Sequence, residues 1–216
     1  MKMNKKRLAL VAMLLMVVFS FSGLLVLFGD NNVNLTSITL IIGIVFYFIT
    51  REPEEKEAMS LKAVPKVLND WKTDLLILMP VVMNIICYAF AKAFVPEFLE
   101  HLSGRTDFLS SGQIVILIAE LIIAALGEEI AWRGFFLSKL SKRLPFVPAL
   151  LITAALFSLC HFSIGNFIVV LYDLLFIVVN AVFYGLIYKR SNSIIVSTTS
   201  HFLANLVGIF GLFLVM

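Results

Sequence analysis

The chain has 216 residues, of which 61% are hydrophobic and only 14% are charged, whereas a soluble domain is usually about 45–50% apolar and about 25% charged. This composition excludes a soluble fold and predicts one membrane domain over residues 1–216, an all-α polytopic helical bundle embedded in a lipid bilayer. The formal net charge of +3 comes from basic residues scattered among loop ends rather than from a basic stripe, which argues against nucleic acid as a partner.

Apolar runs recur along the whole chain, and because a spanning helix needs roughly 20 mostly apolar residues, they predict about seven transmembrane helices, with six to eight as the range. The runs cover residues 8–28, 35–49, 75–95, 114–133, 146–162, 167–188 and 194–215. The first run is longer than the apolar part of a signal peptide, about 7–15 residues, and no small-x-small cleavage site follows it. It is therefore expected to be an uncleaved first span.

Polar connections separate these runs at residues 29–32, 51–72, 96–112 and 191–193. The stretch 51–72 mixes glutamates with basic residues and is predicted to be a solvated loop with a short interfacial helix, with a partner-docking surface as the alternative. Cys87 and Cys160 both fall within apolar runs and lack CxxC or Cys/His zinc spacing, so they are expected to be free thiols.

The basic residues alternate between successive connections, and cytoplasmic loops of membrane proteins carry an excess of Lys and Arg. Of the 17 basic residues, Arg105 falls on the opposite side and Lys92 and Arg133 fall within spans. The alternation predicts a multi-pass protein of the cell membrane with a cytoplasmic N-terminus and an external C-terminus. The residues on the predicted inner side are Lys2, Lys5, Lys6, Arg7, Arg51, Lys56, Lys62, Lys66, Lys72, Lys139, Lys142, Arg143, Lys189 and Arg190.

Ionisable residues inside the spans are the strongest functional signal, because each costs about 2.5–3.5 kcal/mol at the bilayer centre and requires a partner or a function. They form three groups in three different runs. The groups are Glu128, Glu129 and Arg133 in the fourth run, His161 at the end of the fifth, and His201 with Asn205 in the seventh.

Helical geometry distinguishes the two adjacent glutamates, because residues four apart share a helix face and neighbouring residues do not. Glu129 is therefore expected to pair with Arg133. Glu128 is left as the carboxylate without an adjacent countercharge and is the candidate reagent. The same spacing places His201 beside Asn205.

A carboxylate, two histidines and an amide on separate helices supply a general base, a second proton carrier and oxyanion donors, which are the groups needed to hydrolyse an amide bond. Glu128, His161 and His201 are equally a zinc-ligand set by residue type. Structural roles remain an alternative, since a buried Glu129–Arg133 pair and histidines hydrogen-bonded between helices also stabilise membrane bundles.

The ordered set EExxxR (from Glu128), FxxxH (Phe157 and His161) and HxxxN (His201 and Asn205) resembles the CAAX protease and bacteriocin-processing family, also called Abi. The motif-bearing core is residues 114–215. This resemblance implies an all-helical fold and an intramembrane endopeptidase that acts on a membrane-associated peptide or protein.

The resemblance also implies residue roles. Glu128 would activate water with help from His161, and His201 and Asn205 would stabilise the oxyanion, while Glu129 and Arg133 would brace the site. The family has been described both as metalloproteases and as metal-free glutamate proteases. Asn is a poor zinc ligand and the chain contains no HExxH motif, so metal-free catalysis without a cofactor is favoured and zinc is the alternative.

Two other functions compete with proteolysis. The first is a non-proteolytic membrane protein with the same fold, either a bacteriocin-immunity protein or the partner of a sensor kinase. The second is a small transporter that uses Glu120, Asp173 and the histidines as a proton relay, although no inverted repeat supports it. Glu120 and Asp173 could also line a substrate path, and Glu120 could instead pair with Lys92.

Overall fold

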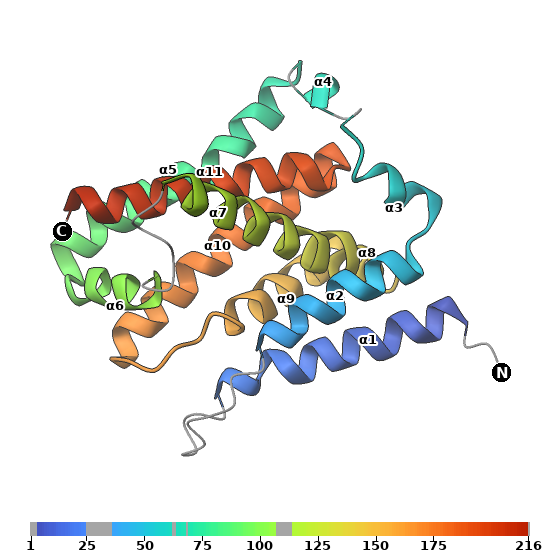
Figure 1. The fold of residues 1–216 in the computed structure, drawn as a ribbon, viewed down its shortest axis with the longest axis horizontal. Coiled ribbons are helices and arrows are strands. Elements are labelled where there is room, and N and C mark those ends of the chain that lie inside the picture. The colour runs from blue at the N-terminus through green and yellow to red at the C-terminus, as the bar shows by residue number, and fades with distance from the viewer. Residues whose placement is uncertain (1–3, 25–35, 62–63, 68, 107–113, 216) are drawn as a thin grey trace.

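The computed structural model describes residues 4–24, 36–61, 64–67, 69–106 and 114–215, and every regular element in these ranges is a helix (Figure 1). The prediction of an all-α membrane bundle is therefore confirmed. The helices are α1 (Lys5–Ser20), α2 (Thr36–Thr50), α3 (Pro53–Glu57), α4 (Val64–Val67), α5 (Trp71–Phe94), α6 (Glu97–Thr106), α7 (Ile114–Glu129), the π-helix η3 (Ile130–Leu137), α8 (Ser138–Leu140), α9 (Phe146–Leu159), α10 (Phe167–Ser191) and α11 (Ile194–Val215).

Each predicted apolar run contains a helix, but the helices differ in length. Within the described ranges, four helical segments are long and apolar enough to cross a membrane: Lys5–Leu24, Trp71–Phe94, Phe167–Ser191 and Ile194–Leu212. Helices α2 and α9 are apolar but shorter, with 15 and 14 residues. Helix α7 continues directly into η3 and α8. The predicted turn at residues 29–32 lies outside the described residues.

Two of the predicted connections contain helices. The stretch 51–72 includes the short helices α3 and α4, so a short helix lies in this connection, and its position at the membrane interface stays a prediction. Helix α6, in contrast, occupies part of the stretch 96–112 that was predicted as a connection, and residues 107–112 lie outside the described part. Its pattern offered a signal, since Glu97 and Glu100 lie in the first turn, where carboxylates favour helix formation.

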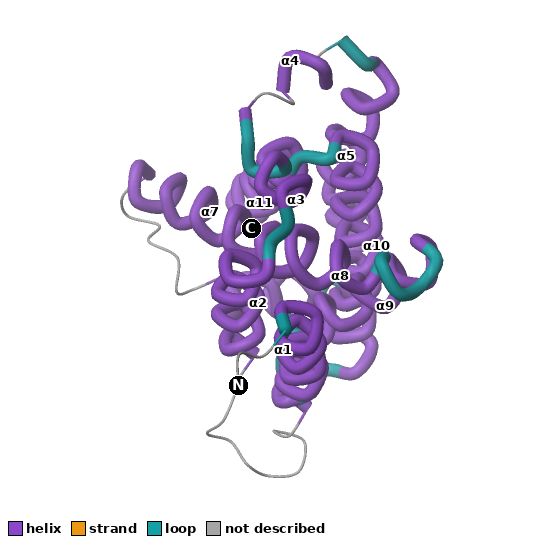
Figure 2. Tube along the Cα trace, turned by 90° about the vertical axis from the view of Figure 1, so that its right-hand side faces the viewer, coloured by secondary structure: helices purple, strands orange, loops and turns teal. Residues whose placement is uncertain are grey.

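The buried centre of the bundle is η3, all eight residues of which are buried. Helix α2 crosses it closely: a Cβ added at Gly43 would lie 2.5 Å from the Cβ of Ala131. Helix α1 packs on α2, α9 packs on α10, and α5 packs on α10 and α11 (Figure 2). The close approach at Gly43 allows η3 to sit deep in the bundle, which fixes the end of α7 where Glu128 and Glu129 lie.

A buried ion-pair network ties α3 to α8. Lys139 Nζ lies 2.6 Å from Glu55 Oε2, and Lys142 Nζ and Ser138 Oγ each lie 2.9 Å from Glu55 Oε1. Burial raises the pKa of the Glu55 carboxyl, but the hydrogen bonds from Lys139 and Lys142 outweigh it and lower the pKa to about 2. Glu55 is therefore a carboxylate at neutral pH and anchors the loop that follows α2.

Candidate active site

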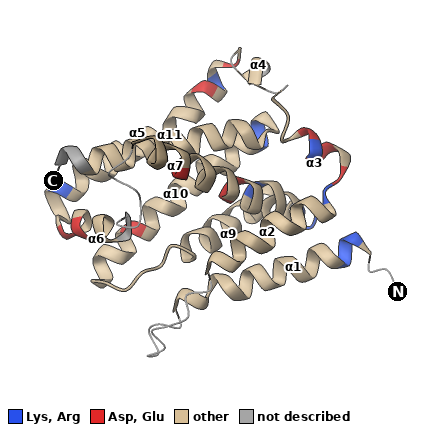
Figure 3. Ribbon diagram, in the orientation of Figure 1, with Lys and Arg blue, Asp and Glu red and all other residues tan. Residues whose placement is uncertain are grey.

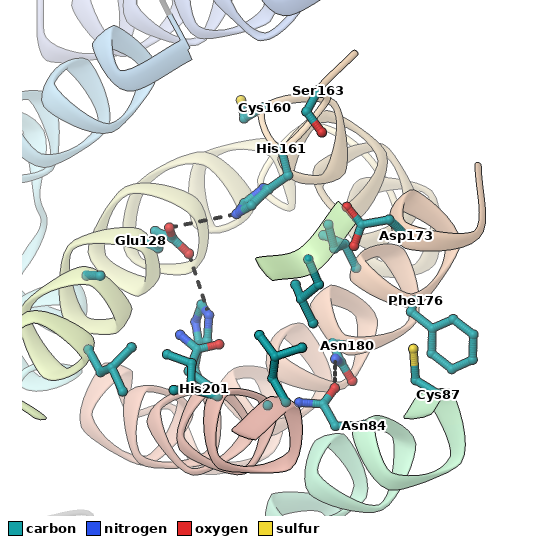
Figure 4. Close-up of a pocket in the computed structure, with 18 of the residues that line it drawn as sticks. Asn84, Cys87, Glu128, Cys160, His161, Ser163, Asp173, Phe176, Asn180 and His201 are labelled. Atoms are coloured by element: carbon teal, nitrogen blue, oxygen red, sulfur yellow. Dashed lines mark hydrogen bonds and ion pairs between the residues drawn. The ribbon is translucent and has the colours of Figure 1, made fainter. Parts of the chain in front are cut away.

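A cavity of about 720 Å³ lies between the helices, enclosed by α5, α6, α7, α10, α11 and the segment that follows α9 (Figure 4). Most of its wall is apolar. Side chains with carboxylate, imidazole, amide or aliphatic hydroxyl groups reach the wall from five parts of the chain: Asn84, Glu120, Glu128, His161, Ser163, Asp173, Asn180, His201 and Asn205. All four predicted catalytic residues therefore line one cavity, although their roles remain predictions.

Glu128 faces both histidines of the motifs. Its Oε1 lies 3.9 Å from His161 Nε2, and its Oε2 lies 3.5 Å from His201 Nε2. The Glu128 side chain is 24% exposed, so it is accessible from the cavity. Atoms separated by 3.5–3.9 Å can both contact one water molecule at a normal hydrogen-bond distance of about 2.8 Å. The three side chains thus converge on a position where a water could be held.

His161 is oriented by the last turn of its own helix. Its Nδ1 lies 2.9 Å from the carbonyl oxygen of Phe157, which can only accept a hydrogen bond, so Nδ1 carries the proton. The Phe157 ring also packs on the imidazole, with ring centroids 4.7 Å apart. Both contacts follow from the four-residue spacing and turn Nε2 toward Glu128.

Glu129 pairs with Arg133 as predicted, but it also holds His201. Arg133 donates to Glu129 Oε1 at 2.8 Å, and His201 Nδ1 lies 2.9 Å from the same oxygen. Glu129 is 0% exposed and Arg133 is 1% exposed. Because an ionised carboxylate only accepts hydrogen bonds, His201 donates through Nδ1. Glu129 therefore fixes which nitrogen of His201 faces Glu128.

Sequence reasoning missed two side chains that complete this arrangement. The Ser197 hydroxyl donates to Glu129 Oε2. The Tyr184 ring stacks on the His201 imidazole, with centroids 4.3 Å apart and an interplanar angle of 17°, and it also lies 5.1 Å from the Arg133 guanidinium. Ser197 lies four residues before His201 on the same helix, so helical spacing could have identified it, whereas Tyr184 is brought in by α10.

Asn205 lines the cavity one turn beyond His201 and is partly buried. Two further asparagines lie in the wall of the cavity and bond to each other. Asn180 Nδ2 donates to Asn84 Oδ1 at 2.8 Å, and Asn84 Nδ2 donates to the carbonyl of Ala204 at 2.7 Å. The sequence analysis did not identify this pair, which joins α5, α10 and α11 beside the cavity.

Glu120 and Asp173 both line the cavity, as the substrate-path interpretation requires, whereas Lys92 is exposed and does not line it. Asp173 lies 3.6 Å from His101 Nε2, and Ser163 Oγ lies 3.3 Å from that same nitrogen. A Ser-His-Asp triad uses the two different nitrogens of the imidazole. Ser163, His101 and Asp173 are therefore not a nucleophilic triad, and their contacts instead attach α6 to the rim of the cavity.

Glu128, His161 and His201 are residue types that zinc accepts as ligands. In the part of the chain that the structure describes, however, no three His, Cys, Asp or Glu side chains are grouped closely enough to hold a metal ion. Both cysteines are free thiols, as predicted.

Comparison with known proteins supports the motif assignment. Residues 110–207 match the family model described as type II CAAX prenyl endopeptidase Rce1-like, which confirms the resemblance to the CAAX protease family. The matched segment contains Glu128, His161, His201 and Asn205. Searches of curated proteins and of solved structures found no match for the chain.

Proposed function

We propose that this chain, in which residues 110–207 match the Rce1-like family model, is an intramembrane endopeptidase of the CAAX protease type, and that its Glu128 activates the water that attacks the scissile peptide bond. The observation that supports this proposal is the convergence of the Glu128 carboxylate with the Nε2 atoms of His161 and His201 at one end of a cavity between the helices. The substrate is a peptide or protein associated with the membrane.

In the proposed reaction, Glu128 takes a proton from the water while His161 Nε2 orients it. The water oxygen forms a bond with the carbonyl carbon, and the carbonyl oxygen becomes an oxyanion. The Asn205 amide and a protonated His201 Nε2 donate hydrogen bonds to that oxyanion. The C–N bond then breaks, and the departing amine receives the proton that Glu128 had taken.

Glu129 supports the role of His201 in this reaction. The carboxylate that accepts from Nδ1 fixes the orientation of the imidazole, so that Nε2 faces Glu128 and the reacting carbonyl group. Arg133 compensates the charge of Glu129 in the buried layer beneath the cavity. Side chains of this chain carry out every step of the proposed mechanism, and no step uses a metal ion.

The test is peptidomics of cells that express the wild type, Glu128→Gln or no protein. Glu128→Gln preserves size and hydrogen bonding but removes the base, so processing should fall by about 10²–10⁴. His161→Ala, His201→Ala and Asn205→Ala should also be folded and nearly inactive, with a loss of about 10²–10³ expected for an oxyanion donor. The control is Glu54→Gln on the exposed surface of α3, which should process normally.

The same experiment separates proteolysis from the alternative of a non-proteolytic immunity protein or sensor-kinase partner. If Glu128→Gln keeps the full cellular phenotype and the peptide profile does not change, the protein acts by binding, and its three motifs are structural.

A further inference from the structure

The cavity extends in one direction only from the catalytic residues. Glu128 is the last lining residue of α7 and His201 is the first lining residue of α11. The two helices pack side by side and run in opposite directions (Figure 1), so both residues mark the same end of the cavity. From there the lining continues to Glu120 on α7 and to Leu212 on α11.

The lining residues of the other helices extend in the same direction. Helix α5 contributes lining residues only from Asn84 onward, toward its C-terminal end. Helix α10 contributes only from Asp173 to Asn180, from its second turn to its middle. Helix α6, which follows α5, adds Phe98 and Leu102. The cavity therefore runs from the catalytic residues to the end of the bundle that carries α6, which we call the α6 end.

The opposite direction is closed by a packed layer. Glu129, Arg133, Trp132 and Ser197 lie directly beyond the catalytic residues, and none is more than 2% exposed. Because this layer is buried and internally hydrogen-bonded, a peptide cannot reach Glu128 from that side without opening the core of the bundle.

The closed side faces the end of the bundle that gathers the basic residues, which we call the basic end. Direct contacts join its parts: Arg143 donates to the carbonyl of Lys6, Lys142 pairs with Glu52, and Arg190 pairs with Asp70. Figure 3 shows this grouping of Lys and Arg. The described basic residues at this end are Lys5, Lys6, Arg7, Arg51, Lys56, Lys72, Lys139, Lys142, Arg143, Lys189 and Arg190.

The α6 end carries far fewer basic residues. Lys92 lies in the last turn of α5 and Arg105 near the end of α6, while Glu97 and Glu100 lie in the first turn of α6. Since loops rich in Lys and Arg tend to remain in the cytoplasm, the distribution of basic residues predicts that the basic end is cytoplasmic and the α6 end is external.

We propose that the catalytic cavity opens on the extracytoplasmic side of the membrane, so that the substrate is a polypeptide segment exposed on that side or lying in the outer half of the bilayer. Ile123 of α7 lines the cavity and is nevertheless 71% exposed, so the wall also reaches the lipid-facing surface. A membrane-anchored segment can enter sideways at this level. Tails of cytoplasmic proteins are excluded as substrates.

The test of accessibility uses single cysteines in a Cys87→Ala, Cys160→Ala background and a maleimide that does not cross membranes. Ser163→Cys and Ile209→Cys report on the cavity, because both residues line it and are partly buried. Gly104→Cys on the exposed surface of α6 and Lys56→Cys on the exposed surface of α3 are the controls for the two sides. Each variant is labelled in intact cells and again after permeabilisation.

Both cavity cysteines and Gly104→Cys should react in intact cells, and Lys56→Cys only after permeabilisation. The proposal is wrong if either cavity cysteine fails to react in intact cells, or if Gly104→Cys and Lys56→Cys react from the same side. Partial reaction of both cavity cysteines in intact cells still supports it when permeabilisation adds no further label.

The substrate part of this inference rests on the proposed function. The labelling result does not, since Glu128→Gln should give the same labelling pattern as the wild type. In the peptidomics experiment, peptides that depend on Glu128 should derive from extracytoplasmic segments. If they derive from cytoplasmic tails, the proteolytic function stands and the assignment of the side is wrong.

Discussion

Arg133→Ala tests the buried layer that supports the proposed catalytic residues. The guanidinium lies 2.8 Å from Glu129, and neither side chain is more than 1% exposed. Removing one partner of such a pair leaves an uncompensated buried charge and costs about 3–5 kcal/mol. For a chain of this length each kcal/mol lowers Tm by roughly 2–4 °C, so the variant should lose about 6–20 °C.

Glu128→Gln is the matched comparison, because it neutralises the neighbouring carboxylate. Glu128 is 24% exposed, and its nearer histidine contact is to His201 Nε2 at 3.5 Å, so its replacement should change stability by about 0.5 kcal/mol or less. Thermal unfolding of the purified variants in detergent, together with the yield of monodisperse protein, measures both effects. An Arg133→Ala variant with wild-type yield and Tm would refute the assigned role of the ion pair.

A double variant separates the loss of charge compensation from the loss of packing. The Nε of Arg133 is buried and has no hydrogen-bond partner among the described residues, so the native pair already carries an unsatisfied donor. Replacing both charges by uncharged groups of similar size is often close to neutral. Glu129→Gln combined with Arg133→Met should therefore be clearly more stable than Arg133→Ala, and equal instability would indicate that packing of the guanidinium dominates.

Three further outcomes are expected. Treatment of the purified protein with a chelator should leave peptide processing largely intact, whereas stoichiometric zinc together with loss of activity would overturn the metal-free mechanism alone. Glu55→Gln should lower Tm; because the folded-state pKa is lowered to about 2, the difference from wild type should be constant above about pH 5 and shrink as the pH falls below the unfolded value of about 4.3. Gly43→Ala should destabilise the fold by about 1–3 kcal/mol in thermal unfolding, since its Cβ would meet Ala131 at 2.5 Å. Gly104→Ala, which has open space around its Cβ, should not be destabilised.

The local part of the site could be predicted from the sequence. The pairing of Glu129 with Arg133 and the packing of Phe157 against His161 each join residues four apart on one helix. Such contacts depend only on helical periodicity. The presence of all these groups in separate apolar runs also indicated that they would meet, because isolated polar groups are unfavourable in the bilayer.

The contacts between helices could not be predicted in the same way. That Glu129 binds His201, and that Tyr184 stacks on it, depends on how α7, α10 and α11 pack. The sequence analysis therefore treated Glu129 as a support for the site and did not identify its bond to His201. Helix α6 was missed because its composition is polar enough to resemble a loop, and its buried face is recognisable only once Phe98 and Leu102 are seen against the cavity.

The π-helix η3 determines the relative orientation of the contacts made before and after it, as well as the distance between them. Each of its N–H groups bonds five residues back, so its residues advance less around the axis than α-helical residues do. Before η3, Glu129 points to His201, and after it, Lys139 points to Glu55. Because a π-helix holds more residues per turn than an α-helix, deleting one residue from 130–137 would favour a regular α-helix and change both the spacing and the angle between the two contacts. The chain length of this segment is therefore under constraint independently of its side chains. Insertions or deletions there should uncouple Glu129 and His201 from the ion pairs of Glu55 even when every motif residue is retained.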